Sequence, residues 1–186
     1  NLAHYARYAL EPIPAPEVDE ALRAALGKLT GLHRVGVIAS IGVRKDAKAV
    51  AALAALLKDA DPTTAQTAAK SLGQIGTVEA AKAIEDSLAS VSDENRSNFC
   101  EGLLRAAEAL SEKGQVDQAI ALYDKLRAQG MDFVTLTDHN RIEGCLEIAD
   151  RQGVFISEQV STRFPDDRCE VQVLVWGINE AQHRDL

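Results

Sequence analysis

Residues 61–84 read DPTTAQTAAKSLGQIGTVEAAKAI, and this stretch decides the fold. It starts with Asp61-Pro62, a pair that suits a helix start because proline is tolerated in the first helical turn. Small and aliphatic residues recur at helical spacing as far as Ile75, and Gly76 separates them from a second helical pattern over residues 78–91. The stretch predicts two helices joined at Gly76, where glycine can take the left-handed conformation that ends a helix.

A second copy of this pattern lies upstream. Residues 40–53 align with residues 74–84, and Gly42 aligns with Gly76 at a separation of 76 − 42 = 34 residues. This period falls within the range of helical-hairpin repeats. We therefore expect Gly42 to end a helix as Gly76 does. Because an isolated hairpin cannot bury both of its faces, the hairpins are expected to stack.

The rest of the first two thirds of the chain is also helical in pattern. Each segment has apolar residues at helical spacing and ends at glycine, proline or a polar turn. The final pair departs from the repeat pattern, as expected where the end of a stack faces something other than another repeat. Beyond the stretch already quoted, the predicted helices span residues 2–10, 18–26, 32–41, 47–57, 98–113 and 116–129.

Composition limits the classes of partner. The 186 residues are 46% hydrophobic but only 4% aromatic, so the core must consist of small and aliphatic side chains, which suits closely packed helices. The net charge of −8 argues against nucleic acid or an anionic membrane as the main partner. No apolar run approaches the roughly 20 residues of a membrane span. No signal peptide is visible, although the chain opens at Asn1 and upstream processing or truncation stays open.

After Gly130 the periodicity changes. Residues 133–137, 154–157 and 171–176 are rich in β-branched residues and predict strands, and residues 140–151 predict a helix between the first two. Strand, helix, strand favours right-handed parallel pairing. The fold class is therefore mainly α: a helical-hairpin solenoid over residues 1–129, then a small partial α/β segment with about three strands over residues 130–186.

The quoted stretch resembles a bacterial HEAT repeat, with its Asp-Pro turn, Ala-rich helix ending Leu-Gly-x-Ile-Gly, and second helix of Glu-Ala-x-x-Ala-Leu type. The resemblance covers residues 2–129 as about four hairpins. It implies protein binding or scaffolding on the concave face of the solenoid, and its Lys/Glu-rich helix faces are expected to be solvated. Residues 2–14 are similar to repeat regions of large, often exported, bacterial proteins, so a cytoplasmic and an exported location both stay open.

Residues 130–140, GMDFVTLTDHN, resemble the second motif of the polymerase and histidinol phosphatase (PHP) family of metal-dependent phosphoesterases. Residues 155–162 and 173–178 resemble the two strands that follow it. The resemblance implies part of an α/β barrel whose metal ions supply hydroxide and neutralise developing phosphoryl charge. His139 falls on a metal-binding histidine of that family, with Asp138 beside it. If the site functions, the expected metal is Zn or Mn.

Most of the other family ligands have no counterpart in this chain. The His-x-His of the first motif is absent, and Gln159 and Gln172 stand where the family has a metal-bridging Glu and a ligand His. A glutamine amide is a poor metal ligand beside a carboxylate or an imidazole. Strand alternation places Glu158 on the face opposite Gln159, and His183 is expected in a solvated tail. We therefore expect no catalytic residue and no resident cofactor.

The three cysteines, Cys100, Cys145 and Cys169, form no Cys-x-x-Cys pair. Three reduced and mostly buried thiols are the simplest expectation, and a single disulfide stays open if the protein is exported.

Three functional classes follow. The leading hypothesis is a non-catalytic protein-binding or scaffolding module. Its rival is a metal-dependent phosphoesterase, a hydrolase whose missing ligands come from another chain or from absent sequence. A structural spacer within a larger protein is the third. Because a small sheet leaves open edges, a homodimer that completes the sheet also stays open.

Metal analysis separates the first two classes. We expect purified protein to carry no stoichiometric Zn or Mn, and His139→Ala to change neither metal content nor hydrolysis of a generic phosphodiester. The measurements are elemental analysis of the purified protein and a colorimetric hydrolysis assay. Stoichiometric metal that disappears together with activity in His139→Ala would establish the phosphoesterase instead.

Overall fold

The computed structural model describes residues 2–130, 134–139, 142, 146, 154–163, 170–176 and 180–184. The chain divides into two compact units, Asn1–Lys113 and Gly114–Leu186. Helix α8 (Val116–Ala128) therefore groups with the strands, whereas the sequence analysis placed the boundary after residue 129.

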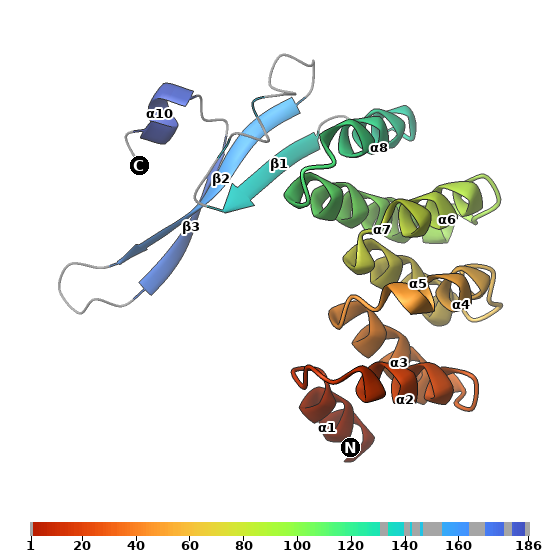
Figure 1. The fold of residues 1–186 in the computed structure, drawn as a ribbon. Coiled ribbons are helices and arrows are strands. Elements are labelled where there is room, and N and C mark those ends of the chain that lie inside the picture. Colours follow the sequence, from red (N-terminus) through yellow and green to blue (C-terminus); the bar gives the residue numbers. More distant parts are fainter. Residues whose placement is uncertain are drawn as a thin grey trace. The chain divides into compact units, whose positions relative to one another are not determined.

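The first unit is helical throughout its regular structure, which confirms the predicted mainly-α class (Figure 1). Its helices are α1 (Leu2–Leu10), α2 (Pro16–Leu26), α3 (Gly31–Val43), the short 3₁₀ helix η1 (Ala47–Ala49), α4 (Val50–Leu56), α5 (Pro62–Ile75), α6 (Val78–Leu88) and α7 (Asp93–Glu112).

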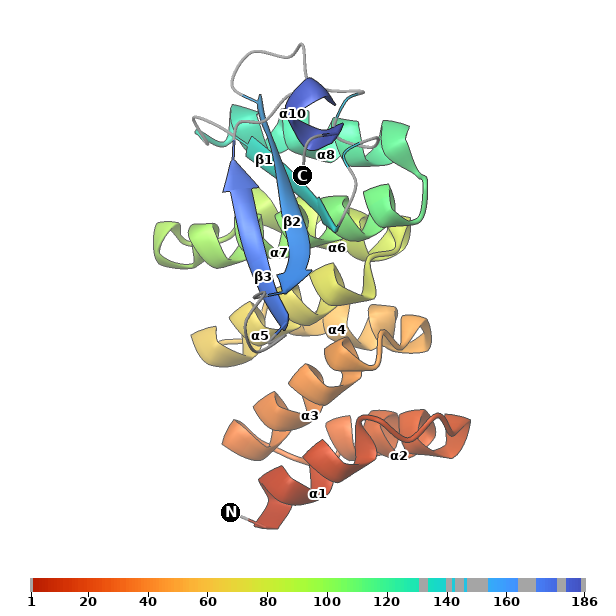
Figure 2. The ribbon, with the colours of Figure 1, turned by 90° about the vertical axis from the view of Figure 1, so that its left-hand side faces the viewer.

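These helices form two layers. In one layer α1 packs on α3, α3 on α5, and α5 on α7. The other layer contains α2, α4 and α6. These helices pack on α3, α5 and α7 of the first layer, respectively. Figure 2 shows α3, α5 and α7 following one another along the stack. The layer of α3, α5 and α7 is the more closely packed of the two. Its neighbouring helices contact each other more extensively than α4 contacts α6.

The turn at the start of α5 forms as the sequence predicts. The carboxylate of Asp61 accepts hydrogen bonds from the backbone N–H groups of Thr63 at 3.3 Å and Thr64 at 3.1 Å, and Pro62 occupies the first turn. These bonds satisfy donors that a helix start otherwise leaves without partners. At the other end, Gly76 has φ 58° and ψ 47°, the left-handed conformation expected of it.

The matching prediction for Gly42 is wrong. Gly42 lies inside α3 and is buried, and the chain reverses three residues later, where Lys45 takes the positive φ of 53°. A Cβ on Gly42 would lie 2.8 Å from Cα of Ser71 in α5, closer than real Cβ atoms come. Glycine at this position therefore serves close helix packing. Sequence spacing alone cannot separate that role from a helix end, because both require the absence of a Cβ.

Two further helix glycines make the same kind of contact. A Cβ built on Gly73 of α5 would lie 2.3 Å from the carbonyl oxygen of Gly102 in α7. A Cβ built on Gly102 would lie 2.6 Å from the carbonyl oxygen of Ala69 in α5. The backbones of α3, α5 and α7 thus meet directly along a glycine seam formed by Gly42, Gly73 and Gly102. Each glycine lowers helix propensity by about 1 kcal/mol relative to alanine, which close packing must offset.

The core around this seam consists of small and aliphatic side chains, as the composition predicts. Phe99 is the one large aromatic among the fully buried side chains of the described residues. Cys100 is a buried free thiol, and burial raises its pKa. The fully buried side chains of the repeats include Ile38, Ile41, Leu53, Ala68, Ala69, Leu72, Ile84, Leu103, Ala106 and Ala107.

One arginine fastens the proline-rich connection between α1 and α2. The guanidinium of Arg44 pairs with Asp19 and holds the pKa of that carboxyl below its usual value. The same guanidinium also donates hydrogen bonds of 2.7–3.2 Å to four backbone carbonyls. Those carbonyls belong to Leu10, Glu11, Ile13 and Ala15. A segment without regular structure therefore has its carbonyl groups satisfied by one side chain.

The second unit contains a three-stranded sheet in the order β1-β2-β3, formed by β1 (Val134–His139), β2 (Val154–Arg163) and β3 (Glu170–Trp176). β1 and β2 are parallel, as predicted, whereas β2 and β3 are antiparallel. A short helix, α10 (Glu180–Arg184), follows. Most of the predicted helix over residues 140–151 lies outside the described residues.

No helix among the described residues is long and apolar enough to cross a membrane.

The glycine seam generates a stability prediction. Gly102→Ala is expected to lower the free energy of unfolding by about 1–3 kcal/mol, because the added methyl meets the backbone of α5 and forces α5 and α7 apart. The measurement is chemical denaturation followed by circular dichroism.

The matched control is Gly27→Ala. Gly27 has φ −78° and no heavy atom within 4 Å of the built Cβ, so the change is expected to be neutral or stabilising by up to about 1 kcal/mol. Equal effects of the two substitutions on the free energy of unfolding would contradict the role of the glycine seam in helix packing.

Candidate functional site

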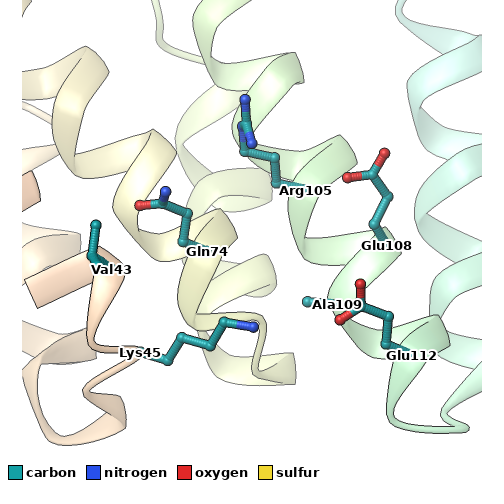
Figure 3. A pocket seen from close by; sticks show the side chains of 8 residues that line it. Val43, Lys45, Gln74, Arg105, Glu108, Ala109 and Glu112 are labelled. Carbon is teal, nitrogen blue, oxygen red and sulfur yellow. The ribbon is translucent and has the colours of Figure 1, made fainter. Parts of the chain in front are cut away.

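A pocket of about 290 Å³ opens across three successive helices of the closely packed layer. Figure 3 shows its side chains converging from the end of α3, from α5 and from α7. We call it the α3–α5–α7 pocket. Its lining residues are Gly42, Val43, Lys45, Gln74, Arg105, Glu108, Ala109 and Glu112.

Two other cavities lie in the first unit. One, of about 490 Å³, is almost entirely apolar and lies among α1, α2 and α3. The second, of about 380 Å³, lies between the turns that precede α5 and α7 and is lined largely by serines and backbone. The α3–α5–α7 pocket has the most ionisable lining of the three, with Lys45, Arg105, Glu108 and Glu112, whereas the second cavity has Lys58 and Asp59. A mixed lining of this kind can fix the orientation of a bound group as well as hold it.

The fold brings this lining together in a simple way. Arg105, Glu108 and Glu112 lie at i, i+3 and i+7 on α7 and so share one helix face. Gln74 stands next to the seam glycine Gly73 near the end of α5. Because the glycine seam removes side chains from between the helices, residues of three helices reach one pocket. The α5 turn closes tightly over the floor: a Cβ on Gly76 would lie 2.2 Å from Cβ of Ala109.

Some of the charges near the pocket already have partners. Arg105 donates two hydrogen bonds, of 2.8 and 3.1 Å, to the Glu101 carboxylate one turn earlier on α7. Lys113, just past α7, donates to the backbone carbonyls of Ile75 at 3.2 Å and Gly76 at 2.6 Å. Its ammonium thereby satisfies carbonyls that the end of α5 leaves without helical partners.

Glu108 is different. Its side chain is half-buried, and within the part of the chain that the structure describes it makes no hydrogen bond or ion pair. Burial raises the pKa of Glu108, and the nearby negative charge of Glu112 raises it further, while Arg105 acts in the opposite direction. The folded protein therefore holds this carboxylate in a site that does not fully stabilise its charge.

The predicted metal residues lie at the end of β1. In the parallel pairing of β1 with β2, Asp138 lies beside Glu158 and His139 beside Gln159. The side chains of Asp138 and His139 lie outside what the structure describes. Among the described residues, no three His, Cys, Asp or Glu side chains gather as a metal site would require. A metal site at His139 therefore stays a prediction.

The two glutamines at family ligand positions contact each other. Nε2 of Gln159 donates to Oε1 of Gln172 at 2.5 Å across the antiparallel pair of strands. Because each amide satisfies the other, both have a structural role that requires no metal.

The expectation of a solvated tail at His183 is wrong. Nδ1 of His183 lies 2.6 Å from Oε2 of Glu158, and the Glu158 side chain is only 3% exposed. Glu158 is thus buried and Gln159 only partly so, but Ser157, on the face opposite Glu158, is buried as well, so alternation alone does not account for this burial. The contact joins residues 25 positions apart, and no local sequence pattern signals it.

The sequence analysis missed the α3–α5–α7 pocket because it treated the charged helix faces as solvated. One signal was available: Glu101, Arg105, Glu108 and Glu112 follow one face of the helix pattern and have small residues such as Ala106, Ala107 and Ala109 beside them. What the sequence could not show is that Lys45 and Gln74, far away in the chain, meet that face.

Glu108 generates a pH prediction. Because its folded pKa is raised, the native state binds a proton that the unfolded state releases, so stability falls as pH rises from the usual value of 4.5 through the folded pKa. Glu108→Gln should therefore unfold at a higher temperature than the wild type at pH 7, and this advantage should disappear below pH 4.5. Thermal unfolding across this pH range measures the effect.

The matched control for this measurement is Glu79→Gln, which removes an exposed carboxylate on α6. Its stability is expected to follow the pH dependence of the wild type. A destabilised Glu108→Gln at pH 7 would show that the pocket stabilises the charged carboxylate instead.

Comparison with known proteins identifies one family. Residues 19–104 match the family described as HEAT repeats, and the search of curated proteins found no match. The matched range runs from α2 into α7 and so contains the whole glycine seam, Gly42, Gly73 and Gly102. It does not extend to residues 130–186, so the expected PHP-like character of that segment stays a prediction. Over residues 19–104, which are 86 of its 186 residues, the chain is similar to HEAT repeats.

Proposed function

We propose that this protein is a non-catalytic protein-binding or scaffolding module whose binding face is the layer of α3, α5 and α7. HEAT repeats suggest protein interaction as a function, and the match over residues 19–104 supports that class here. The observation that carries the choice of face is the α3–α5–α7 pocket, which gathers charged and polar side chains from three helices.

The packing of the layers supports the choice of face. A two-layer stack curves toward the layer whose members lie closer together, and the glycine seam makes α3, α5 and α7 the closer layer. This layer is then the concave side of the stack. A concave surface can surround a partner on more than one side, which increases the area buried in a complex.

The chemistry of the pocket also suits a polypeptide partner. Val43 is 52% exposed and offers apolar surface, while the Gln74 amide can donate to and accept from a partner backbone. Neither Gln74 nor Glu108 has a hydrogen-bonding partner within the described part of the chain. Polar side chains without a hydrogen-bonding partner gain the most when a bound protein donates hydrogen bonds to them or accepts hydrogen bonds from them.

A second candidate comes from the strand segment. The resemblance of residues 130–186 to PHP phosphoesterases supports a metal-dependent hydrolase with His139 and Asp138 as ligands, completed by another chain. β1 pairs with β2 in parallel, as expected for a strand–helix–strand unit, whereas β3 pairs with β2 in the antiparallel direction. The metal analysis described above tests this candidate directly.

The binding face can be tested by site-specific crosslinking. A photo-crosslinking residue at Gln74 is expected to capture a protein from a lysate of the source cells, whereas the same residue at Lys82 on α6, which is 71% exposed, is not. The captured protein is then purified, and its affinity for the full chain is measured. Gln74→Arg, which fills the pocket, should weaken binding at least about tenfold, or about 1.4 kcal/mol.

Lys82→Glu serves as the matched control and should leave the affinity unchanged, because it alters an exposed charge on the other layer. Capture from Lys82 alone, or an affinity insensitive to Gln74→Arg, would place the binding face elsewhere.

A further inference from the structure

We propose that the α3–α5–α7 pocket binds a cationic side chain, lysine or arginine, of a polypeptide partner, with the Glu108 carboxylate as its counter-ion. This inference rests on the proposed function, because it names the chemistry of the partner at the same site.

The balance of charges in the pocket leads to this conclusion. Of its four ionised side chains, Arg105 is already bonded to Glu101. Figure 3 shows the side chains of Lys45 and Glu112 extending toward one another in this view of the pocket. With Glu101 included, the pocket has the carboxylates of Glu101, Glu108 and Glu112 against the cations of Lys45 and Arg105, so its net charge is −1. Glu108 is the carboxylate whose pKa burial raises, and Arg105 only partly offsets that effect. The partner that best complements this pocket brings a single positive charge.

The half-buried position of Glu108 is expected to strengthen its attraction for a cationic side chain. Its carboxylate is half-buried, so an ion pair formed there is screened by water less than a pair on an open surface. The same burial raises the pKa of Glu108, and an incoming cation would lower it again by favouring the charged form. A charge-assisted hydrogen bond to this carboxylate is stronger than one between neutral groups.

The shape of the pocket fits a long side chain. Its volume of about 290 Å³ is roughly ten times the 30 Å³ that one water molecule occupies in the liquid, so it can hold a long side chain with some water. Val43, Ala109 and the bare backbone at Gly42 provide apolar walls. Lysine and arginine place a methylene stem along apolar surface and keep the charged end among polar groups.

Other occupants fit less well. An acidic side chain could approach Lys45, but it would also face Glu108 and Glu112, and Arg105 is already bonded to Glu101. An apolar side chain would remove water from the Glu108 carboxylate and supply no hydrogen bond in return. Only a cationic group gains from the feature that makes this pocket unusual.

The test uses the full chain and three short peptides. Each peptide is an acetylated and amidated Ala/Gly segment with one central side chain: arginine, its neutral analogue citrulline, or glutamate. Binding is followed by amide chemical shifts, and the Glu108 carboxyl is followed by a ¹³C pH titration. We expect the arginine peptide to shift the signals of Gln74 and Ala109 with a Kd near the millimolar range, which is about 4 kcal/mol for one anchored side chain.

Two variants with the same change in net charge complete the experiment. Glu108→Gln should weaken binding of the arginine peptide about tenfold, whereas Glu79→Gln on α6 should leave it unchanged. The citrulline and glutamate peptides should bind more weakly than the arginine peptide. The arginine peptide should also lower the titration midpoint of Glu108.

Two outcomes would overturn the inference: equal binding of the arginine and citrulline peptides, or equal losses in Glu108→Gln and Glu79→Gln. The second outcome would mean a general attraction between opposite net charges. If the peptides fail while crosslinking at Gln74 still yields a partner whose affinity falls in Gln74→Arg, the binding face stands and only the cationic occupant is wrong.

Discussion

The direct contact of helix backbones at Gly42, Gly73 and Gly102 is the constraint on which the repeat unit depends. At these three positions a Cβ would collide with main-chain atoms of the next helix, so main-chain atoms set the spacing of α3, α5 and α7 there. Main-chain contact at such short range is intolerant of added volume but rich in dispersion contacts. It explains why a core that is poor in aromatic residues can hold the unit together. Alanine, leucine and isoleucine then fill the remaining space on either side.

The same constraint creates the pocket. Close helices bring side chains from separate repeats within reach of each other, and the turns at their ends leave a depression lined by those side chains. Glu108 stands there with no hydrogen bond or ion pair among the described residues, and burial raises its pKa, so the pocket is expected to disfavour its charged form. A residue that lowers stability without an internal compensation is typical of a site under functional constraint. The geometry and the charge of the pocket therefore point to the same surface.

Local features of the fold could be read from the sequence, and long-range ones could not. The Asp61 cap and the left-handed Gly76 follow from local preferences of single residues, and both are present. Gly42 shares the sequence context of Gly76, but its role is decided by Ser71 on a different helix. The pairing of His183 with Glu158 and the meeting of Lys45 with α7 depend likewise on tertiary packing. Periodicity carries no information on such contacts.

The glycine seam also affects how the repeat unit can bend. In a bent beam there is a line, the neutral axis, along which length does not change, and it lies on the side that resists compression most strongly. Main-chain atoms already in contact at Gly73 and Gly102 cannot move closer, so this line runs along α3, α5 and α7. Flexing then changes mainly the spacing of α2, α4 and α6. A pocket located beside the neutral axis keeps its dimensions while the rest of the unit adjusts its curvature to a partner.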